Sequence, residues 1–527
     1  MPDATKQTNR LARHAGAMSA AVMLSRLLGL LRDLVFAFFF GATWAADAFN
    51  LAFIIPNLLR RLFGEGALAA AFVPIYQDIG VKRGREQQIR FGLKVLGLLS
   101  GLLAALCVVG ILLAPWIVRL MAPGFDDATT ELATRLTRIL FPYLFLIGLS
   151  STFIAILNSH DYYFVPGLSS AFLNLGMIAV LGGYGLLHTG ATNTQLATML
   201  ALGTLLGGVL QTVVNWPLLR RVGYRARLLL EWRGEAMQAL WRRFLPGVLG
   251  IAVWQVNAVV DRMLASLLVV GSISALAYGY RLMQLPLGIF GVALGTAAVP
   301  HFSRCVSSGD WPQLNRKLRF SILSMLLLML PVTTLIAAQG QAYIRILFLR
   351  GAFDQRALEM SYLALLCYSL GLVFFSLNRV LVPVFYAHGD TRTPVKISVV
   401  TAAVNIVLDV ILMQFLAHAG LALGTSIAAA VQTTLLLVTM HRRFGHVRPG
   451  GMARQVGKVL ALSLGLYVVI AVAEFWWPAP GFAMLLVRSV VLGVLWIVLT
   501  AGGAMLLGVE SSREVGRAIG KKLKVIS

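Results

Sequence analysis

The chain has 527 residues, of which 58% are hydrophobic and only 13% are charged, and its mean hydropathy is +0.81. An ordinary soluble domain is about 45–50% apolar and about 25% charged, so this composition excludes a disordered, fibrous or ordinary soluble enzyme chain. The net charge is +24. In a membrane protein such an excess indicates basic cytoplasmic loops beside anionic lipid, so we expect membrane lipids as partners and no nucleic acid.

Fourteen apolar runs are long enough to cross a bilayer, which takes about 20 residues. In chain order they lie near residues 17–40, 46–79, 88–122, 130–158, 164–188, 193–219, 238–269, 271–305, 315–338, 356–386, 393–416, 420–443, 452–477 and 482–507. Pro56 and Pro74 interrupt the second run, and Pro286 and Pro300 interrupt the eighth. Interrupted spans indicate bent helices around a cavity, because the freed backbone groups need partners in protein or water. The predicted class is an all-α polytopic membrane protein with about fourteen transmembrane helices.

Lysine and arginine are distributed unevenly between alternate loops. They concentrate in the two tails and in every second loop, whereas the opposite loops hold Arg345, Arg350 and Arg356. An even number of spans places both termini on the same side of the membrane, and the positive-inside rule predicts that this side is the cytoplasm.

Two short patterns recur at nearly the same spacing. The Val-Pro pair beginning at Val73 recurs 226 residues later at Val299, and His160 recurs 228 residues later as His388. Six spans separate the members of each pair, and an even number preserves orientation, so we predict two parallel six-helix repeats. Two additional helices follow the repeats.

These patterns divide the chain into six predicted segments. They are a cytoplasmic N-tail at 1–16, an N-terminal six-helix lobe at 17–219, a basic cytoplasmic linker at 220–237, a C-terminal six-helix lobe at 238–443, two additional helices at 444–507 and a basic cytoplasmic C-tail at 508–527.

Charged residues inside the expected spans are the candidates for function, because an arginine or aspartate at a helix centre costs about 2.5–3.5 kcal/mol on insertion scales. The arginines that internal pairing explains least well are Arg26, Arg32, Arg60 and Arg281. Several guanidinium groups around a water-filled cavity form an anion site, and the planar fork of arginine binds phosphate oxygens in bidentate fashion. The pattern indicates a substrate with phosphate groups.

A second set of polar residues has the spacing of a cation site. Asn257 and Asp261 are four residues apart and share a helical face, and Asn405 and Asp409 repeat that spacing. Their oxygen atoms are ligands of the kind that a hard cation takes. The alternative is that each aspartate caps a neighbouring helix or pairs with a nearby arginine.

The sequence contains no recognisable catalytic constellation. The phosphate-binding pattern GxxxxGK[ST] and the zinc pattern HExxH are absent, and three scattered cysteines form neither a disulfide framework nor a thiolate metal site. We therefore expect a transporter without a cofactor rather than an enzyme.

Several blocks of the sequence are highly specific. They are SRLLG at 25–29 with Arg32 and Asp33, ADAF at 46–49, PNLLRRLFGEGA at 56–67 and AFVP at 71–74, followed downstream by APW at 114–116, APGF at 122–125, RLM at 281–283, PLG at 286–288, GVALGT at 291–296 and TPVK at 393–396. These blocks closely resemble the MurJ/MviN family of lipid II flippases, and the resemblance covers nearly the whole chain.

This resemblance implies a fold and an activity. The family belongs to the multidrug/oligosaccharidyl-lipid/polysaccharide exporter superfamily and has fourteen helices, arranged as two six-helix lobes and two extra helices that form a groove for the lipid tail. It moves lipid II, the undecaprenyl-pyrophosphate-linked peptidoglycan precursor, from the inner to the outer leaflet of the bacterial cytoplasmic membrane by alternating access.

The resemblance also implies roles for individual residues. It assigns functional arginines to Arg26, Arg32, Arg60 and Arg281 and a functional acid to Asp47. Some members have a sodium site between spans of the second lobe, where the Asn-Asp pairs fall. Tyr280 and Gln284 stand where some relatives have acidic residues around the span 8 arginine, which argues against a charge relay there.

Two other functions stay open at this level. A drug/cation antiporter of the same superfamily would need a net acidic cavity, which the arginines disfavour. A non-transporting scaffold for cell-wall assembly would use the arginines only for internal pairing and would bind other cell-wall synthesis proteins. The energy source is open between a coupling monovalent cation and the membrane potential, which is worth about 2.3 kcal/mol per charge per 100 mV.

Overall fold

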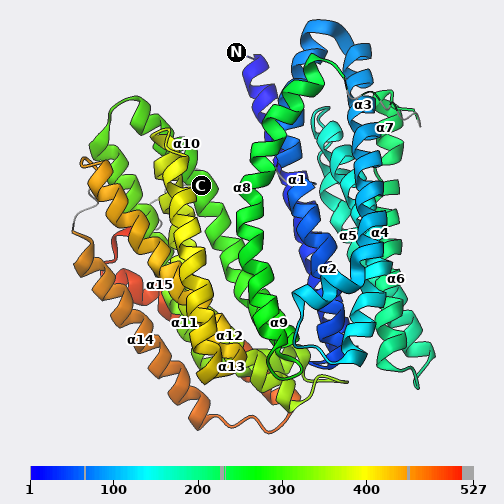
Figure 1. Ribbon diagram of the computed structural model, residues 1–527. Helices are drawn as coiled ribbons and strands as arrows, with labels where there is room; N and C mark the ends of the chain where they lie inside the picture. The colour runs from blue at the N-terminus through cyan, green and yellow to red at the C-terminus, as the bar shows by residue number, and fades with distance from the viewer. Residues whose placement is uncertain are drawn as a thin grey trace. The chain divides into compact units, whose positions relative to one another are not determined.

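The computed structural model describes residues 2–63, 67–225, 229, 231, 233–447 and 451–512. Throughout these ranges the chain forms helices joined by loops and turns, without a strand, which confirms the predicted all-α class (Figure 1). Nine helical stretches of the described chain are long and apolar enough to cross a membrane. The count of fourteen crossings stays a prediction.

Packing divides the chain into two compact units. Unit 1 comprises Met1–Gly271 with Arg350–Phe353, and unit 2 comprises Ser272–Leu349 with Asp354–Ser527. The helix over Glu235–Ser266 falls in unit 1 because it packs against the helix over Ala67–Met121. The predicted lobes at 17–219 and 238–443 describe the sequence repeat rather than this packing, and their boundaries stay a prediction.

The described residues of unit 1 form eight helices. They are α1 (Pro2–Phe40), α2 (Trp44–Phe63), α3 (Ala67–Met121), α4 (Asp127–Asn158), α5 (Phe164–Leu187), α6 (Asn193–Val213), α7 (Trp216–Val222) and α8 (Glu235–Ser266). α1 packs on α5, α2 and α3 pack on α4, and α5 packs on α6 (Figure 1). Gly84 interrupts α3 with φ 84° and ψ 169°, a conformation that glycine adopts at little steric cost. α3 is therefore two helical segments.

An apolar core in unit 1 joins the two segments of α3 to α4 and α8. The rings of Phe72 and Phe91, one from each side of Gly84, are stacked with centroids 5.8 Å apart, and Phe72 is fully buried. Phe244 of α8 belongs to the same core. The break at Gly84 thus folds α3 back on itself around buried aromatic rings.

Unit 2 contains the remaining helices. They are α9 (Ser272–Pro286), the π-helix η1 (Leu287–Gly291), α10 (Val292–Ser307), α11 (Trp311–Phe348), α12 (Gln355–Ala387), α13 (Arg392–Arg443), α14 (Met452–Trp476) and α15 (Phe482–Leu506). The expected interruption of the eighth apolar run is present as η1. α13 breaks at Ala417, which has φ 48° and ψ −131°. A Cβ on Gly420 would overlap the carbonyl of Leu412, so only glycine permits this reversal.

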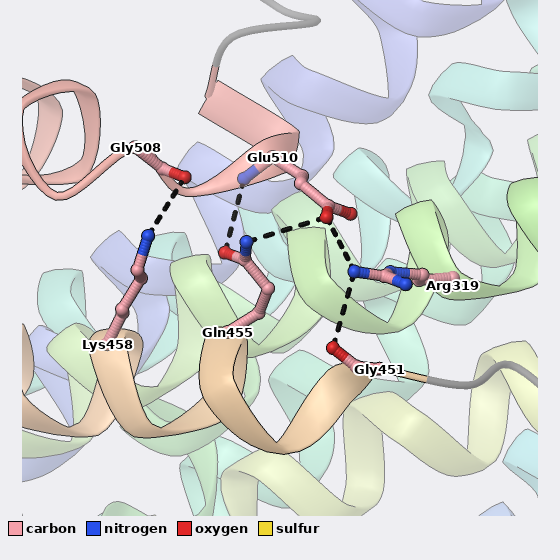
Figure 2. A network of polar contacts seen from close by, with 6 residues as sticks. All are labelled: Arg319, Gly451, Gln455, Lys458, Gly508 and Glu510. Carbon is pink, nitrogen blue, oxygen red and sulfur yellow. Dashed lines mark hydrogen bonds and ion pairs between the residues drawn. The ribbon is translucent and has the colours of Figure 1, made fainter.

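A polar network attaches the last two helices to α11. Figure 2 shows its six members: Arg319, Gly451, Gln455, Lys458, Gly508 and Glu510. Nη2 of Arg319 lies 2.5 Å from Oε1 of Glu510 and also donates to the carbonyl of Gly451 at 3.3 Å. Gln455 donates to the same carboxylate at 3.5 Å and accepts from the backbone N–H of Glu510 at 3.4 Å. The network joins the start of α14 and the segment after α15 to α11.

We expect Glu510→Gln to loosen this attachment, because it replaces a charged acceptor that Arg319 and Gln455 share. Ion pairs at partly exposed sites are worth about 0.2–1 kcal/mol. Hydrogen exchange at residues 508–512 should therefore accelerate severalfold, with a fall of a few degrees at most in the unfolding temperature. Asp78→Asn, which removes the exposed pair between Asp78 and Lys82, is the matched control. Equal exchange at 508–512 in both variants would contradict this role of Glu510.

Candidate anion-binding site

Arg32 of α1 is held by its own helix and by α5. Its Nε and Nη2 donate to Oδ1 of Asp33 at 3.0 and 2.8 Å, and its Nη1 donates to Oδ1 of Asn174 at 2.9 Å. The Arg32 side chain is 20% exposed. A guanidinium has five N–H groups, so these contacts among the described residues leave one on each terminal nitrogen. Those two N–H groups suit the oxygens of a bound anion.

Asn174 is a site residue that the sequence analysis missed. It is buried in α5, and its Nδ2 donates to the carbonyl of Ser25 at 3.2 Å while its oxygen accepts from Arg32. A Cβ on Gly29 would lie 3.6 Å from Nδ2 of Asn174, an ordinary van der Waals distance, so α1 passes close to Asn174 of α5 at this point. The signal that could have identified Asn174 is a side-chain amide within the apolar run 164–188.

The other predicted arginines are distributed over both units. Arg26 is exposed on α1. Arg60 lies on α2, and its side chain falls outside the described set. Arg281 is half-buried on α9 of unit 2 and is engaged in an interaction with another group. The structure therefore places Arg26 and Arg32 on one helix, and the gathering of all four around one cavity stays a prediction.

Asp47, the predicted functional acid, lies in the first turn of α2. It is 4% exposed, and its Oδ2 accepts a hydrogen bond from the backbone N–H of Gly271 at 2.7 Å. Gly271 has φ 94°, and a Cβ on it would overlap the carbonyl of Ala42. Asp47 therefore holds the turn after α8 against the start of α2, and its role in transport stays a prediction.

The predicted cation ligands lie in continuous helix, as their spacing requires. Asn257 and Asp261 are half-buried on α8 of unit 1. Asn405 and Asp409 are 2% and 0% exposed on α13 of unit 2, and a Cβ on Gly424 would overlap Oδ1 of Asp409. The members of each pair thus lie on one helix, and their role as cation ligands and the meeting of the two pairs stay predictions.

A buried ion pair in the last two helices also escaped the sequence analysis. Arg488 of α15 is 8% exposed and donates to Oε1 of Glu474 at 2.6 Å and to the carbonyl of Trp477 at 3.0 Å. These contacts close the turn between α14 and α15. Because both partners belong to one helical hairpin, we interpret these contacts as stabilising the hairpin.

These features define a multi-pass membrane protein with charged side chains held inside apolar helices. The family model described as "Lipid II flippase MurJ" matches residues 36–491, and the chain belongs to this family. It is 34% identical to a probable lipid II flippase MurJ of Rhizobium tropici, over 92% of this chain and 91% of the relative. It is 33% identical to a probable lipid II flippase MurJ of Vibrio cholerae, over 82% and 83% of the two chains.

Solved structures agree with this membership. The structure titled lipid II flippase MurJ, inward closed conformation, superposes with a TM-score of 0.77 at 25% identity, covering 93% of this chain and 99% of that chain. An inward-facing multidrug resistance transporter of the MATE family superposes with a TM-score of 0.67 at 15% identity, covering 83% and 99%. The second likeness shows a shared fold alone.

Proposed function

We propose that this protein is a lipid II flippase of the bacterial inner membrane. It is a transporter, not an enzyme, and it moves the undecaprenyl-pyrophosphate-linked peptidoglycan precursor from the inner to the outer leaflet by alternating access. Family membership over residues 36–491 is the observation that carries this proposal. Lipid II and membrane lipids are its partners, and further cell-wall synthesis proteins are proposed partners as well.

The environment of Arg32 suits a pyrophosphate group. An anion entering an apolar span is strongly disfavoured unless cationic donors replace its water. Asp33 and Asn174 orient the Arg32 guanidinium and leave one N–H on each terminal nitrogen. Such a pre-oriented fork offers a bidentate contact without the entropy cost of ordering a free side chain. Arg26, Arg60 and Arg281 are the proposed additional contacts.

The proposed architecture has fourteen crossings, two parallel six-helix repeats and both termini in the cytoplasm. Corresponding caps support the repeat. Asp126 accepts from the N–H of Thr129 at the start of α4, and 228 residues later Asp354 accepts from the N–H of Ala357 at the start of α12. The lobes would span 17–219 and 238–443, joined by the linker at 220–237. Helices in 444–507 would form the lipid-tail groove, and 1–16 and 508–527 would be cytoplasmic tails.

Reconstitution into vesicles tests the proposed function. Purified protein in vesicles that contain labelled lipid II should increase its appearance in the opposite leaflet over protein-free vesicles, with and without an imposed potential. A scaffold would leave the rate at the protein-free level. A drug/cation antiporter would instead move a cationic dye in exchange for a cation that flows down its gradient. It would leave lipid II in its original leaflet.

We also propose that Asn257, Asp261, Asn405 and Asp409 bind a coupling monovalent cation. The burial of Asn405 and Asp409 supports this, because a buried carboxylate is strongly stabilised by a bound cation. At a concentration 100 times Kd, a cation that binds only the folded state stabilises it by about 2.7 kcal/mol. Sodium should therefore raise the unfolding temperature of the wild type relative to choline at equal ionic strength.

The same sodium response should disappear in Asp261→Ala and persist in Asp127→Ala, which removes an exposed carboxylate at the start of α4. Thermal unfolding in detergent measures both. A sodium response of wild-type size in Asp261→Ala would leave only helix capping or ion pairing for these residues. Transport of lipid II that is driven by a sodium gradient would indicate ion coupling and would distinguish it from use of the membrane potential.

A further inference from the structure

Two histidine side chains meet in unit 2 outside the helices. His388 directly follows α12, and His446 lies in the segment between α13 and α14. Their Nε2 atoms are 3.2 Å apart. Two nitrogen ligands at 2.0–2.1 Å from a tetrahedral zinc ion lie about 3.3–3.4 Å from each other. The two imidazoles are therefore spaced as neighbouring ligands of one metal ion.

Hydrogen bonding determines which nitrogen of His388 carries the proton. Its Nδ1 lies 2.8 Å from the carbonyl oxygen of Val384, and a carbonyl can only accept. Nδ1 is therefore the donor, and in the neutral ring Nε2 presents its lone pair to His446, whose Nε2–H donates to it in the metal-free protein. A metal ion bound by both Nε2 atoms would replace that proton. A metal-binding histidine typically donates its second ring N–H to a carbonyl or carboxylate in this way.

Neighbouring side chains hold both rings in place. The His388 ring stacks on Phe444 with centroids 4.0 Å apart and an interplanar angle of 17°. The His446 ring lies 3.8 Å from the Trp311 ring, and Asn315 donates to the carbonyl of His446 at 2.8 Å. These contacts fix the rings and leave the two Nε2 atoms facing each other, as a pre-organised metal site requires.

The chemistry of the pair selects the class of ion. Asp390, the nearest carboxylate in sequence, is paired with Arg443 at 2.9 Å and accepts from the N–H groups of Arg392 and Thr393. No group of three or more histidine, cysteine or acidic side chains that could hold a metal ion occurs in the part of the chain that the structure describes. Two imidazoles with water in the remaining positions favour Zn²⁺, Cu²⁺ or Ni²⁺ over Mg²⁺ and Ca²⁺.

We propose that His388 and His446 bind one divalent transition-metal ion, which links the end of α12 to the segment that leads into α14. This site is independent of the proposed transport function. The corresponding histidine of unit 1, His160, lacks such a site because its Nε2 is 2.9 Å from the hydroxyl of Tyr76. Tyr224 donates to that hydroxyl at 3.0 Å, so the Tyr76 proton is directed to His160.

Zn²⁺ titration of the full chain tests the proposal. The protein is purified in detergent without a polyhistidine tag, treated with a chelator and titrated calorimetrically near pH 7.5. We expect one ion per chain. Even losing an outer-shell partner typically costs 10–100-fold in metal affinity, so His446→Ala and His388→Ala should each weaken binding by at least about tenfold. His188→Ala, which removes an exposed histidine of unit 1, should bind as the wild type does.

Trp311 provides a local readout. Cu²⁺ at the site should quench its fluorescence, and the quenching should be absent in Trp311→Phe and in His446→Ala. Binding should also weaken as the pH falls, because protons compete with the metal ion for imidazole nitrogen.

Two results would overturn the site. One is equal Zn²⁺ affinity in the wild type and in a folded His388→Ala, His446→Ala double variant. The other is Mg²⁺ binding as tight as that of Zn²⁺. Because His446 is exposed, His446→Ala keeps the test valid even if His388→Ala fails to fold.

Discussion

Lipid II translocation should fall about 10- to 100-fold when Arg32 is replaced by alanine, because a hydrogen bond to a charged group is worth about 1.5–3 kcal/mol. The lost group is the fork that Asp33 and Asn174 orient. Initial rates in reconstituted vesicles measure the effect, with the amount of folded protein checked by gel filtration. The translocation rate of Arg32→Lys should lie between those of the wild type and Arg32→Ala, since lysine keeps the charge and loses the bidentate geometry.

The same loss is expected for alanine at Arg26, Arg60 and Arg281. Arg138→Ala provides the matched control, because it removes an arginine that is exposed on α4. Asn174→Ala should reduce transport less than Arg32→Ala, since the guanidinium remains but is less firmly oriented. If all four alanine variants transport lipid II at the wild-type rate, the anion site does not exist.

Asp47→Ala should lower the free energy of unfolding by about 1–3 kcal/mol, because it leaves the N–H of Gly271 buried without its acceptor. Asp47→Asn retains an oxygen that can accept the same bond and should destabilise the protein less. Thermal unfolding in detergent measures the difference. Lipid II transport by a folded Asp47→Asn variant then separates the two roles of this residue, since it removes the negative charge and keeps the hydrogen bond.

Asp127→Ala serves as the reference for these measurements, because its carboxylate is exposed at the start of α4. A stability of Asp47→Ala equal to that of Asp127→Ala would refute the role of the Asp47–Gly271 bond. Wild-type transport by Asp47→Asn would exclude a functional charge at this position and leave Asp47 as a structural residue.

Periodic and compositional signals predicted the class of the fold well. The apolar runs at 356–386 and 452–477 lie on α12 and α14 within a few residues, and the interruption after Pro286 is a π-helix. The position of an apolar span and the breaks that proline and glycine cause depend on residues that are close together in the sequence, so they can be predicted without knowledge of the packing. The arginines of α1 were recognisable for the same reason, because a charge within an apolar run is visible without any partner.

Partners distant in sequence were not predictable in this way. Arg32 meets Asn174 142 residues away, and Asp47 meets Gly271 224 residues away. His388 was singled out only as a repeat marker, and its contact with His446 was not foreseen. Each contact depends on which helices pack together and on the rotation of each about its axis. Composition and spacing determined that this is a multi-pass membrane protein with arginines in its spans, whereas packing between helices decided which groups hold those side chains and which nitrogen and oxygen atoms stay available to a ligand.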